Sequence, residues 1–466
     1  MSGRSWVSVA LVGVLVVALA ACSTPAGTPS EPPQTPSASA TGDPAKNPGW
    51  QAVPIDQQVR DVCWSPAAKL AAVLATSGDD VTVSGVDLAA GTVAWTSAVA
   101  TVPADPSGYS NSHLGCDKEG HAVVVATPPY DGERAVTTTV ATVGMKDGTV
   151  VAKRDVPDMG SYFLVAGLVV LQTGDLVDAY ATTDLTTPVW ETAGRVSGVV
   201  GDDFVVLESL VVRADTGAPA GFGDDVGGNG VSYAGSGAGH VIRVETLGDV
   251  TTGKGECQVR YQGWDVATNA PLWTVTGMQG VFSYADEVFY LLSGVTGTGI
   301  GCACQLSAGR PTMTAYSMKD GSELWSLQLP EFSGTTGIEM INDTDPASGL
   351  PQAVTSVAYR TQVAGTYRKV VVLVNIPGRE AQTVEGDLTG YGAQTAHFAT
   401  SKKGANPGQV GYDTLSVNQE PLWTVDYPSM AGDGGGVMAA QVGPWLVAYP
   451  APARGDARGL SVLREK

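Results

Sequence analysis

The sequence has little positive charge: 26 Lys and Arg residues stand against 46 Asp and Glu residues, and the formal net charge is −20 at pH 7. Proteins that bind nucleic acid need a basic patch or stripe, often interleaved with aromatic side chains. No such stretch is present. We therefore expect no nucleic acid partner, and the excess of acid predicts a soluble body that stays away from anionic lipid.

Histidine is also scarce, and the motifs of several enzyme classes are missing. The four histidines, His113, His121, His240 and His397, fall in separate parts of the chain without the spacing of metal ligands. A Gly-x-Ser-x-Gly nucleophile elbow and a Walker-type phosphate loop are both absent. The sequence therefore predicts no catalytic residue and no metal site, and each histidine is expected at the surface or hydrogen-bonded in the core.

Long apolar runs are absent after the first 21 residues. The run from Trp6 to Ala21 follows a single Arg4, which is typical of a secretory signal, and it is short of the ~20 residues that a membrane span needs. It ends in Leu19-Ala20-Ala21-Cys22, which resembles the lipobox of bacterial lipoproteins, where the Cys thiol receives a diacylglyceryl group before cleavage. We expect a signal peptide over residues 1–21 and a lipid on Cys22. The alternative is an ordinary signal peptide followed by a chance cysteine.

A lipid on Cys22 would hold the chain at the extracytoplasmic face of the cell membrane. Residues 23–48 are rich in Ser, Thr, Pro, Ala and Gly and have no apolar period, so residues 22–48 are expected to form a disordered tether. Residues 49–466 contain no second linker of this kind, which favours one large folded domain.

The body is rich in Gly, Val, Thr and Ala, and it has almost no stretch with apolar residues at helical spacing. Short β-branched runs are bounded by Gly, Asp, Asn or Pro, which predicts an all-β protein. Examples of such runs are Val81–Val83, Ala122–Val125, Leu168–Leu171, Phe204–Leu207 and Val370–Val374.

The body also repeats itself. Met145-Lys146-Asp147-Gly148 recurs as residues 318–321, and Pro271-Leu272-Trp273-Thr274-Val275 recurs as residues 421–425. An anchor position, four residues after the turn glycine or its equivalent, recurs at a mean spacing of roughly 47 residues, which suits one four-stranded propeller blade. The anchors are Trp95, Ala152, Trp190, Gly221, Trp273, Trp325, Gln382 and Trp423.

This spacing predicts a β-propeller of about eight four-stranded blades, within a range of seven to nine. A strict count gives nine units, but the unit that ends at Gly221 is short and lacks the tryptophan. The last unit has three strands after Trp423, and the strand Trp50–Val53 resembles the missing fourth strand. We expect this N-terminal strand to close the ring and to remove its open edges.

The segments Val86–Trp95 and Tyr316–Trp325 give the clearest view of the repeat: a small apolar strand, a polar residue, Ala-Gly or Asp-Gly, and Trp four residues later. This pattern resembles the quinoprotein-type repeat of PQQ-dependent alcohol dehydrogenases and of the lipoprotein of the outer-membrane β-barrel assembly machinery. The resemblance implies that the repeated Trp is structural, lying between neighbouring blades with its indole N–H donated to a backbone carbonyl. The residues concerned are Trp95, Trp190, Trp273, Trp325 and Trp423.

Five cysteines follow Cys22, and disulfides persist outside the cytoplasm. Cys63 and Cys116 precede their anchors by similar distances, which predicts a disulfide between the inner strands of adjacent blades. Cys257 occupies a corresponding place to Cys302 and Cys304 and is expected to pair with either one, leaving one thiol. The Cys302-Ala303-Cys304 segment has an alternative, a soft metal such as Cu(I), but no Met or His cluster accompanies it.

Two classes of function agree with these features. The first, which we favour, is a non-catalytic, membrane-anchored lipoprotein whose propeller is a scaffold that binds a protein, peptide or glycan of the cell envelope without a cofactor. The second is the PQQ-dependent dehydrogenase that the resemblance implies, oxidising an alcohol or sugar with PQQ and calcium. Such enzymes carry a vicinal Cys-Cys disulfide and an Asp/Glu/Asn calcium site, whereas this chain has Cys302-Ala303-Cys304.

Replacing Cys22 with Ala tests the lipoprotein assignment. A diacylglyceryl group provides two acyl chains, which give stable membrane attachment. We expect the Cys22→Ala protein to lose both the membrane attachment and the processing of the wild type when cells are fractionated. Unchanged membrane association and processing would rule out the lipobox.

Overall fold

The computed structural model describes the chain between Trp50 and Leu463, with gaps. The gaps are residues 104–110, 130–135, 209, 221–230, 238–239, 248–257, 266–267, 269, 278–279, 284–286, 294–296, 301–302, 307–309, 331–335, 342–353, 364–365, 386, 392–395, 401–410, 416–420, 427–436, 444 and 451–458. Within the described residues every regular element is a β-strand, and no helix is long and apolar enough to cross a membrane.

The described strands form nine antiparallel sheets, which we number in chain order. The first sheet holds β2 (Gln58–Ser65), β3 (Leu70–Ser77), β4 (Asp80–Asp87) and β5 (Thr92–Thr101); the second holds β6 (Asn111–Cys116), β7 (His121–Thr127), β8 (Thr137–Gly144) and β9 (Val150–Pro157); the third holds β10 (Met159–Val165), β11 (Leu168–Thr173), β12 (Leu176–Ala181) and β13 (Asp184–Ala193). The fourth holds β14 (Val196–Val200), β15 (Phe204–Leu207) and β16 (Val211–Arg213); the fifth holds β17 (Val231–Gly237), β18 (His240–Leu247), β19 (Gln258–Asp265) and β20 (Ala270–Gly277); the sixth holds β21 (Gly280–Ser283), β22 (Val288–Ser293), β25 (Thr312–Ser317) and β26 (Glu323–Gln328). The seventh holds β23 (Gly297–Ile300), β24 (Ala303–Leu306), β27 (Thr336–Ile341), β28 (Val354–Val363), β29 (Thr366–Asn375) and β30 (Glu380–Glu385); the eighth holds β31 (Asp387–Tyr391), β32 (Ala396–Thr400), β33 (Gly411–Leu415) and β34 (Pro421–Asp426); the ninth holds β35 (Val437–Val442), β36 (Trp445–Pro450), β37 (Leu460–Leu463) and β1 (Trp50–Val53).

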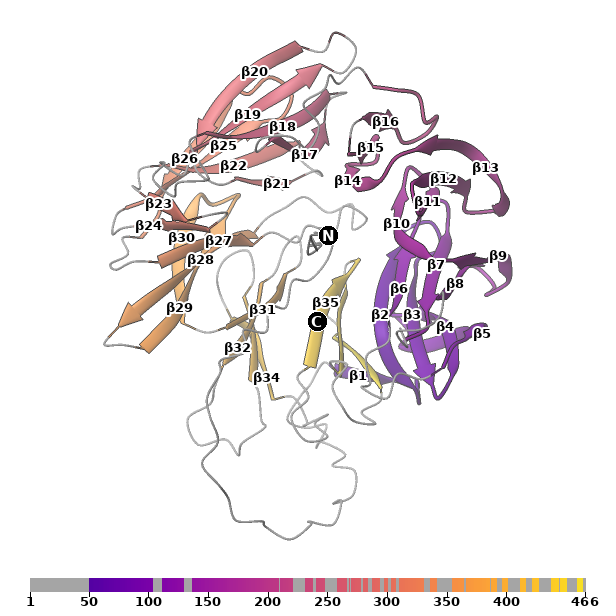
Figure 1. Cartoon of the computed structure of the whole chain (residues 1–466). Helices are drawn as coiled ribbons and strands as arrows, with labels where there is room; N and C mark the ends of the chain where they lie inside the picture. The colour runs from indigo at the N-terminus through magenta and orange to yellow at the C-terminus, as the bar shows by residue number, and fades with distance from the viewer. Residues whose placement is uncertain are drawn as a thin grey trace, which may run out of the picture.

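Most sheets are runs of hairpins, and successive sheets follow one another around a common centre (Figure 1). The first strands of neighbouring sheets contact each other, for example β2 with β6, β14 with β17, and β31 with β35. This arrangement of separate antiparallel sheets is a β-propeller, the architecture that the repeat predicted.

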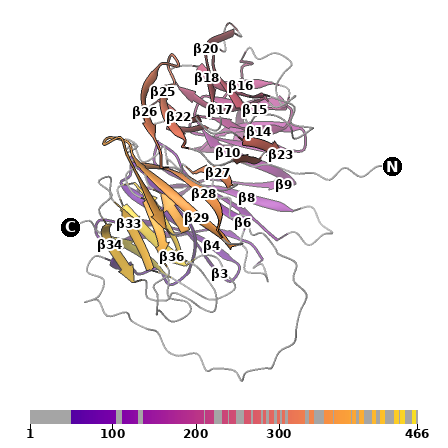
Figure 2. The same cartoon turned by 90° about the vertical axis from the view of Figure 1, so that its left-hand side faces the viewer.

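The first and the last described strands lie side by side. Trp50 pairs with Leu463 and Val53 with Leu460, so β1 is the fourth strand of the ninth sheet. Val447 of β36 packs with Val73 of β3 and Val86 of β4 in one apolar cluster, and the three strands lie in the same part of the molecule in Figure 2. The strand expected to join the two ends of the chain therefore does pair with β37.

The core is divided into apolar layers, each between two consecutive sheets. One layer joins the first and second sheets through side chains such as Leu74 and Val124, and another joins the ninth and first sheets through Val447 and Val73. Alternating side chains of a strand point to opposite faces of its sheet, so each sheet contributes to two layers. Among the apolar clusters of the described residues, none belongs to a single sheet.

Two sheets differ from the four-stranded pattern. The short unit expected to disturb the count forms the fourth sheet, which has three strands and an isolated bridge between Val212 and Pro219. The seventh sheet has six strands, because the hairpin β23–β24 from the sequence between β22 and β25 joins β27. The described residues thus contain nine sheets, against the eight blades expected from the sequence.

Trp95 shows how two sheets are joined. Its ring lies over Gly85, its register partner on β4, and under Gly148 in the turn of the second sheet. A Cβ at Gly148 would lie 2.6 Å from the ring, and Gly148 has a φ of +76°, so glycine is required there on both grounds. Nε1 of Trp95 donates to the carbonyl oxygen of Met145 at 3.0 Å, which is the contact expected from the repeat.

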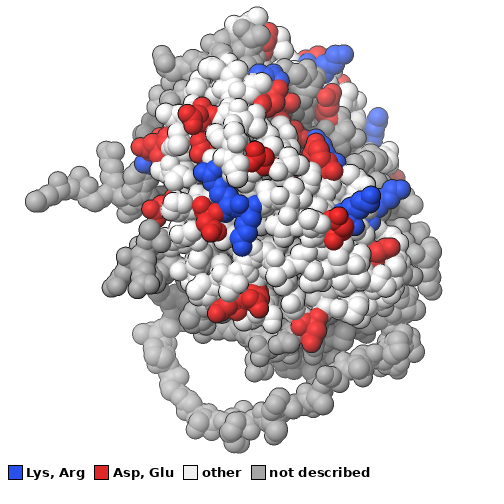
Figure 3. All heavy atoms as spheres, turned by 90° about the vertical axis from the view of Figure 1, so that its right-hand side faces the viewer, with Lys and Arg blue, Asp and Glu red and all other residues white. Residues whose placement is uncertain are grey.

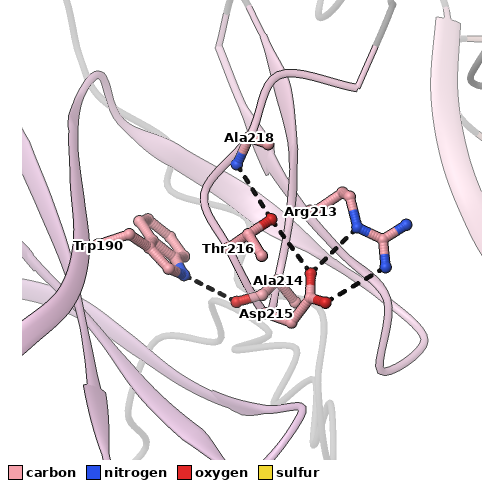
Figure 4. A network of polar contacts seen from close by, with 6 residues as sticks. All are labelled: Trp190, Arg213, Ala214, Asp215, Thr216 and Ala218. Carbon is pink, nitrogen blue, oxygen red and sulfur yellow. Dashed lines mark hydrogen bonds and ion pairs between the residues drawn. The ribbon is translucent and has the colours of Figure 1, made fainter.

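Trp190 makes the same joint between the third and fourth sheets (Figure 4). Its ring is 8% exposed, and Nε1 donates to the carbonyl oxygen of Ala214 at 2.8 Å. Gly217 closes the turn that holds Ala214, with a φ of +66° and no room for a Cβ beside the indole. Arg213 and Asp215 of this turn form an ion pair directed away from the ring (Figure 4).

Trp273 departs from the expected contact. Its ring packs on Gly321 of the sixth sheet, but its buried Nε1 has no hydrogen-bond partner among the described residues. The equivalent acceptor, the carbonyl oxygen of Met318, instead accepts a hydrogen bond from Nε2 of His240. His240 is 3% exposed and lies edge-on to the Trp273 ring, so this histidine takes the place of the indole as donor.

A matched pair of glycine substitutions measures the indole joint. Gly217 and Gly78 have similar positive φ values, +66° and +59°, but a Cβ at Gly78 would have no atom within 4 Å, whereas a Cβ at Gly217 would meet Trp190. We expect Gly217→Ala to cost about 2–4 kcal/mol and Gly78→Ala about 1 kcal/mol, because only the former adds overpacking to the backbone strain. Thermal or denaturant unfolding measures both values, and equal losses would show that the ring contact contributes nothing.

Candidate functional site

The inner strands of the first two sheets are linked twice. The structure contains a disulfide between Cys63 on β2 and Cys116 on β6, with Cα atoms 5.7 Å apart, which is the pairing that the sequence predicted. Two residues away, Oδ2 of Asp61 accepts a hydrogen bond from the backbone N–H of Leu114 at 3.0 Å. Its Oδ1 accepts from the N–H of Val62 at 2.8 Å. The carboxylate therefore satisfies a backbone donor of the neighbouring sheet, beside the covalent link.

Asp61 also lies in a group of titratable side chains at these inner strands. Burial raises the pKa of Asp61, an effect opposed by the N–H donors of Leu114 and Val62 and by the nearby His113. Burial and the Asp61 charge together raise the pKa of both Tyr162 and Tyr449. The rings of His113 and Tyr162 are 5.8 Å apart. This acidic and aromatic cluster draws on four sheets, and no sequence motif marks it.

The contacts of His121 have the wrong geometry for nucleophilic catalysis. Oδ2 of Asp117 lies 2.7 Å from Nδ1 of His121, and Oγ1 of Thr182 lies 3.3 Å from the same nitrogen. In a catalytic triad the acid and the nucleophile contact different ring nitrogens, so that the ring can relay a proton between them. Here the buried Asp117 also accepts from the backbone N–H of His121, which makes it a turn-stabilising residue.

A cavity of about 390 Å³ opens between the ninth and first sheets. It is lined by Trp64, Pro66, Lys69, Asp87, Ala89 and Trp445. The two indoles are partly buried, and Lys69 is exposed at the β2–β3 turn. We name this cavity the Trp64–Trp445 pocket. Its volume falls within the range of ligand sites, and its open walls combine two aromatic rings with two charged side chains.

The walls of the Trp64–Trp445 pocket are held by backbone features on both sheets. Gly443, with a φ of +58°, lies against the Trp64 ring, where a Cβ would come within 2.7 Å of it. On the other side, Oδ1 of Asp87 accepts from the N–H of Ala90 at 2.9 Å and fixes the β4–β5 turn. The pocket is therefore preformed by the packing of the two sheets.

The chain enters the described body next to this pocket. Trp50 pairs with Leu463, which pairs with Leu446, the residue after Trp445. Nε2 of Gln51 donates to the carbonyl oxygen of Ala90 at 3.0 Å. Gln51 also fills the space against Gly91 that a repeated Trp fills elsewhere. The start of β1 and the pocket thus lie at the same end of the strands of the ninth sheet.

Charged side chains are mixed on the described part of the surface that Figure 3 shows, where Lys and Arg lie among Asp and Glu. Several are paired, for example Lys118 with Asp202 and Arg195 with Asp175. Among the described residues, no three His, Cys, Asp or Glu side chains come together as a candidate metal site.

Several residues singled out from the sequence lie outside the described residues: Cys22, Cys257 and Cys302. Cys304 is described as part of β24, and its backbone pairs with Gly299. Trp423 pairs with Thr414 on β33, as the anchor position requires. Trp325 pairs with Ala315 and its ring lies 5.8 Å from that of Tyr290 in the layer between the sixth and seventh sheets.

Comparisons with known proteins add little beyond the fold. No family model matches the chain. It is similar to a crystal structure of a eukaryotic initiation factor, with 11% identity, a TM-score of 0.38, and coverage of 80% of this chain and 89% of that one. It is also similar to the β-propeller domain of the trilobed protease from Pyrococcus furiosus, with 8% identity, a TM-score of 0.36, and coverage of 77% of this chain and 95% of that one. A third similar structure is the protein lmo1340 of Listeria monocytogenes, with 9% identity, a TM-score of 0.37, and coverage of 79% of this chain and 94% of that one. Similarities this weak carry no argument about function.

Neither the Asp61 cluster nor the Trp64–Trp445 pocket is predicted by a motif in the sequence. Trp64 lies one residue after Cys63 on an inner strand, so it does not occupy the repeated anchor position on an outer strand. Trp445 begins β36, far from Trp64 in the sequence. The one signal available was that these two tryptophans do not fit the repeat.

Replacing Asp61 with Asn tests the electrostatics of the cluster. Because burial raises the pKa of Asp61 above 3.8, its contribution to stability is largest below that pH and is lost as the pH rises through the folded-state pKa. Asn carries no charge, so the melting temperature of the wild type minus that of Asp61→Asn should fall between pH 3.5 and pH 7.

The matched control is Asp147→Asn. The N–H of Thr149 lowers the pKa of the exposed Asp147, so its contribution to stability is present above pH 3.8 and is lost on acidification. The corresponding temperature difference should therefore rise with pH. A difference for Asp61→Asn that also rises with pH would contradict the assignment of burial as the dominant cause.

Proposed function

We propose that this chain is a lipid-anchored protein of the cell envelope whose propeller is a binding module and not an enzyme. Cys22 carries the lipid, residues 22–48 form the tether, and the partner is a protein, peptide or glycan of the envelope. The observation that carries the proposal is the Trp64–Trp445 pocket, a preformed cavity between two sheets that opens beside Lys69 and Asp87.

The chemistry of the pocket supports recognition. Indole faces bind apolar and aliphatic ring surfaces over a large area, and binding to rigid walls costs little conformational entropy. The ammonium of Lys69 and the carboxylate of Asp87 add orientation and charge selectivity. Neither group is paired with a histidine or a nucleophile among the residues that line the cavity, so the arrangement supports binding without a chemical step.

We also propose that the fold is a quinoprotein-type propeller in which each of the nine sheets is one blade and β1 closes the ring. Support for closure comes from the pairing of β1 with β37 and from the apolar layer that joins the ninth and first sheets. Support for the repeat type comes from the joints at Trp95 and Trp190, where an indole N–H is donated to the turn of the next sheet.

Reversing one charge in the pocket tests the binding function. The measurement is a pull-down from detergent-solubilised envelope. We expect Lys69→Glu to capture about tenfold less of the partners that the wild-type propeller captures, because it places a like charge in the pocket with Asp87. Lys146→Glu is the matched control, since Lys146 is an exposed lysine in a turn of the second sheet, outside the pocket. Equal capture by both variants and the wild type would contradict the proposal.

The quinoprotein dehydrogenase is the competing function, and it predicts a different result. Under that function, purified protein acquires the absorbance of bound PQQ when PQQ and calcium are added, and it oxidises an alcohol or sugar with an artificial dye as acceptor. Either observation would replace the binding module with an enzyme.

A further inference from the structure

The Trp64–Trp445 pocket has two aromatic walls that come from different sheets. Trp64 lies on β2 of the first sheet, and Trp445 begins β36 of the ninth. Both side chains line the cavity and are only partly buried. An indole is a flat, rigid apolar surface, so it binds another flat apolar face with little loss of conformational entropy. The pocket therefore suits a ligand with a flat C–H face.

The polar groups of the pocket walls are not used by the fold. Among the described residues, the indole N–H groups of Trp64 and Trp445 have no hydrogen-bond partner, whereas the indoles of the Trp joints donate to the turn of the next sheet. Oδ1 of Asp87 accepts from the N–H of Ala90. Its Oδ2 and the ammonium of Lys69 have no partner in the described part of the chain. The walls thus retain donors and an acceptor for a ligand beside the aromatic surfaces.

The two charged groups of the pocket have opposite signs. Among the described residues that line it, Lys69 and Asp87 are the charged ones, so the lining has no net charge at neutral pH. An anionic ligand would lie near the carboxylate and a cationic ligand near the ammonium, whereas a neutral ligand meets no like charge. A hydroxyl group both donates and accepts, so neighbouring hydroxyls can bond to an ammonium and to a carboxylate.

The volume of the pocket limits the ligand to a small unit. A cavity of about 390 Å³ lies near the lower end of the range of small-molecule sites, about 300–1,000 Å³. A pyranose ring has C–H groups on its faces, hydroxyls around its rim and no charge, which are the properties that the walls select. A peptide segment is the alternative, but each of its buried backbone N–H and C=O groups would also need a partner.

We propose that the Trp64–Trp445 pocket binds a neutral sugar unit of an envelope glycan. One face of the sugar ring packs on the indoles, and its hydroxyls bond to Lys69 and Asp87. The inference rests on the proposed function, because it names the class of ligand for the same site. Among the protein, peptide and glycan partners of that function, it selects the glycan.

Two matched pairs of disaccharides test the selection for a neutral ring. The first pair is N,N′-diacetylchitobiose and its cationic deacetylated form; the second is the methyl ester of digalacturonic acid and its anionic free acid. Full-length protein, in a detergent without a sugar headgroup, is titrated with each by calorimetry and ligand-observed NMR. We expect the neutral member of at least one pair to bind with millimolar affinity, about fivefold more tightly than its charged partner. Absence of binding by both neutral disaccharides would overturn the proposal.

Charge variants show whether this selection comes from the pocket. Asp87→Asn keeps an oxygen that accepts from the N–H of Ala90 but leaves a net positive lining, so binding of digalacturonic acid should improve about fivefold relative to its ester. Lys69→Gln should improve the deacetylated chitobiose in the same way, and Lys69→Gln/Asp87→Asn should restore the preference for the neutral member. Lys146→Gln and Asp147→Asn, in a turn outside the pocket, are the matched controls and should change nothing. Equal selectivity in all variants would refute the assignment.

The aromatic wall has its own test. Trp445→Leu removes a ring that lines the pocket and should weaken binding of the neutral disaccharide about tenfold, while Trp445→Phe retains a ring and should bind within about threefold of the wild type. The melting temperatures of the two variants are measured in parallel. Equal binding by Trp445→Leu and the wild type would contradict stacking of the sugar on the indoles.

A competition experiment separates this inference from the proposed function. Partners captured in the pull-down are treated with an excess of the disaccharide that binds, which should release them. If capture depends on Lys69 but neither neutral disaccharide binds or releases the partners, only the sugar assignment is wrong, and the partner is a protein or peptide. If a neutral disaccharide binds in the pocket while capture ignores Lys69, the sugar assignment holds and the proposed function fails.

Discussion

The contact of an indole ring with a turn glycine of the next sheet is the constraint on which the described propeller depends. A glycine at positive φ lets the turn approach the ring, and the N–H of the indole reaches a carbonyl of that same turn. The aromatic area stabilises the joint, and the absence of a Cβ sets the spacing of the sheets. The described sheets share apolar side chains with their neighbours. A substitution that disturbs one indole contact therefore also disturbs the packing of the apolar layers on both sides of that sheet.

The joints also show how the repeat tolerates substitution. Between the fifth and sixth sheets, His240 donates to the carbonyl oxygen of Met318, the acceptor equivalent to the one that the indole uses at Trp95. In the second sheet, where Ala152 replaces the anchor Trp, Arg154 donates to the carbonyl oxygen of Leu185 in the third sheet and lies over the Tyr180 ring. In the ninth sheet, Gln51 donates to Ala90. The preserved element is a donor that reaches the turn of the next sheet, and its chemical identity varies.

The junction of the first sheet with its neighbours contains the features most relevant to function. The disulfide and the Asp61 carboxylate link the first sheet to the second, and the Trp64–Trp445 pocket lies between the first sheet and the ninth. Because β1 comes from the start of the body and pairs with the end, this junction is also where the N-terminal segment arrives. The first sheet is therefore linked to both of its neighbours, and the proposed binding site lies beside the strand with which the described chain begins.

The sequence alone determined the features that depend on local patterns. Short β-branched runs bounded by turn residues predicted an all-β chain, the recurring Trp and glycine turn predicted the propeller, and matching offsets predicted the Cys63–Cys116 disulfide. Each of these follows from spacing along one chain, because every repeat places equivalent residues at equivalent positions. The localisation at the cell membrane is likewise predicted from the sequence, by Cys22 and the apolar run before it, and it stays a prediction.

Only the tertiary structure decided what depends on residues far apart in the chain. The short unit between Val196 and Pro219 was not expected to count as a separate blade, yet it packs as a separate sheet because its neighbours bury both of its faces. The Asp61 cluster and the Trp64–Trp445 pocket bring together side chains from sheets at opposite ends of the sequence. No periodicity encodes such proximity, since it arises when the first and last sheets meet, and the residues that meet there are the ones outside the repeat.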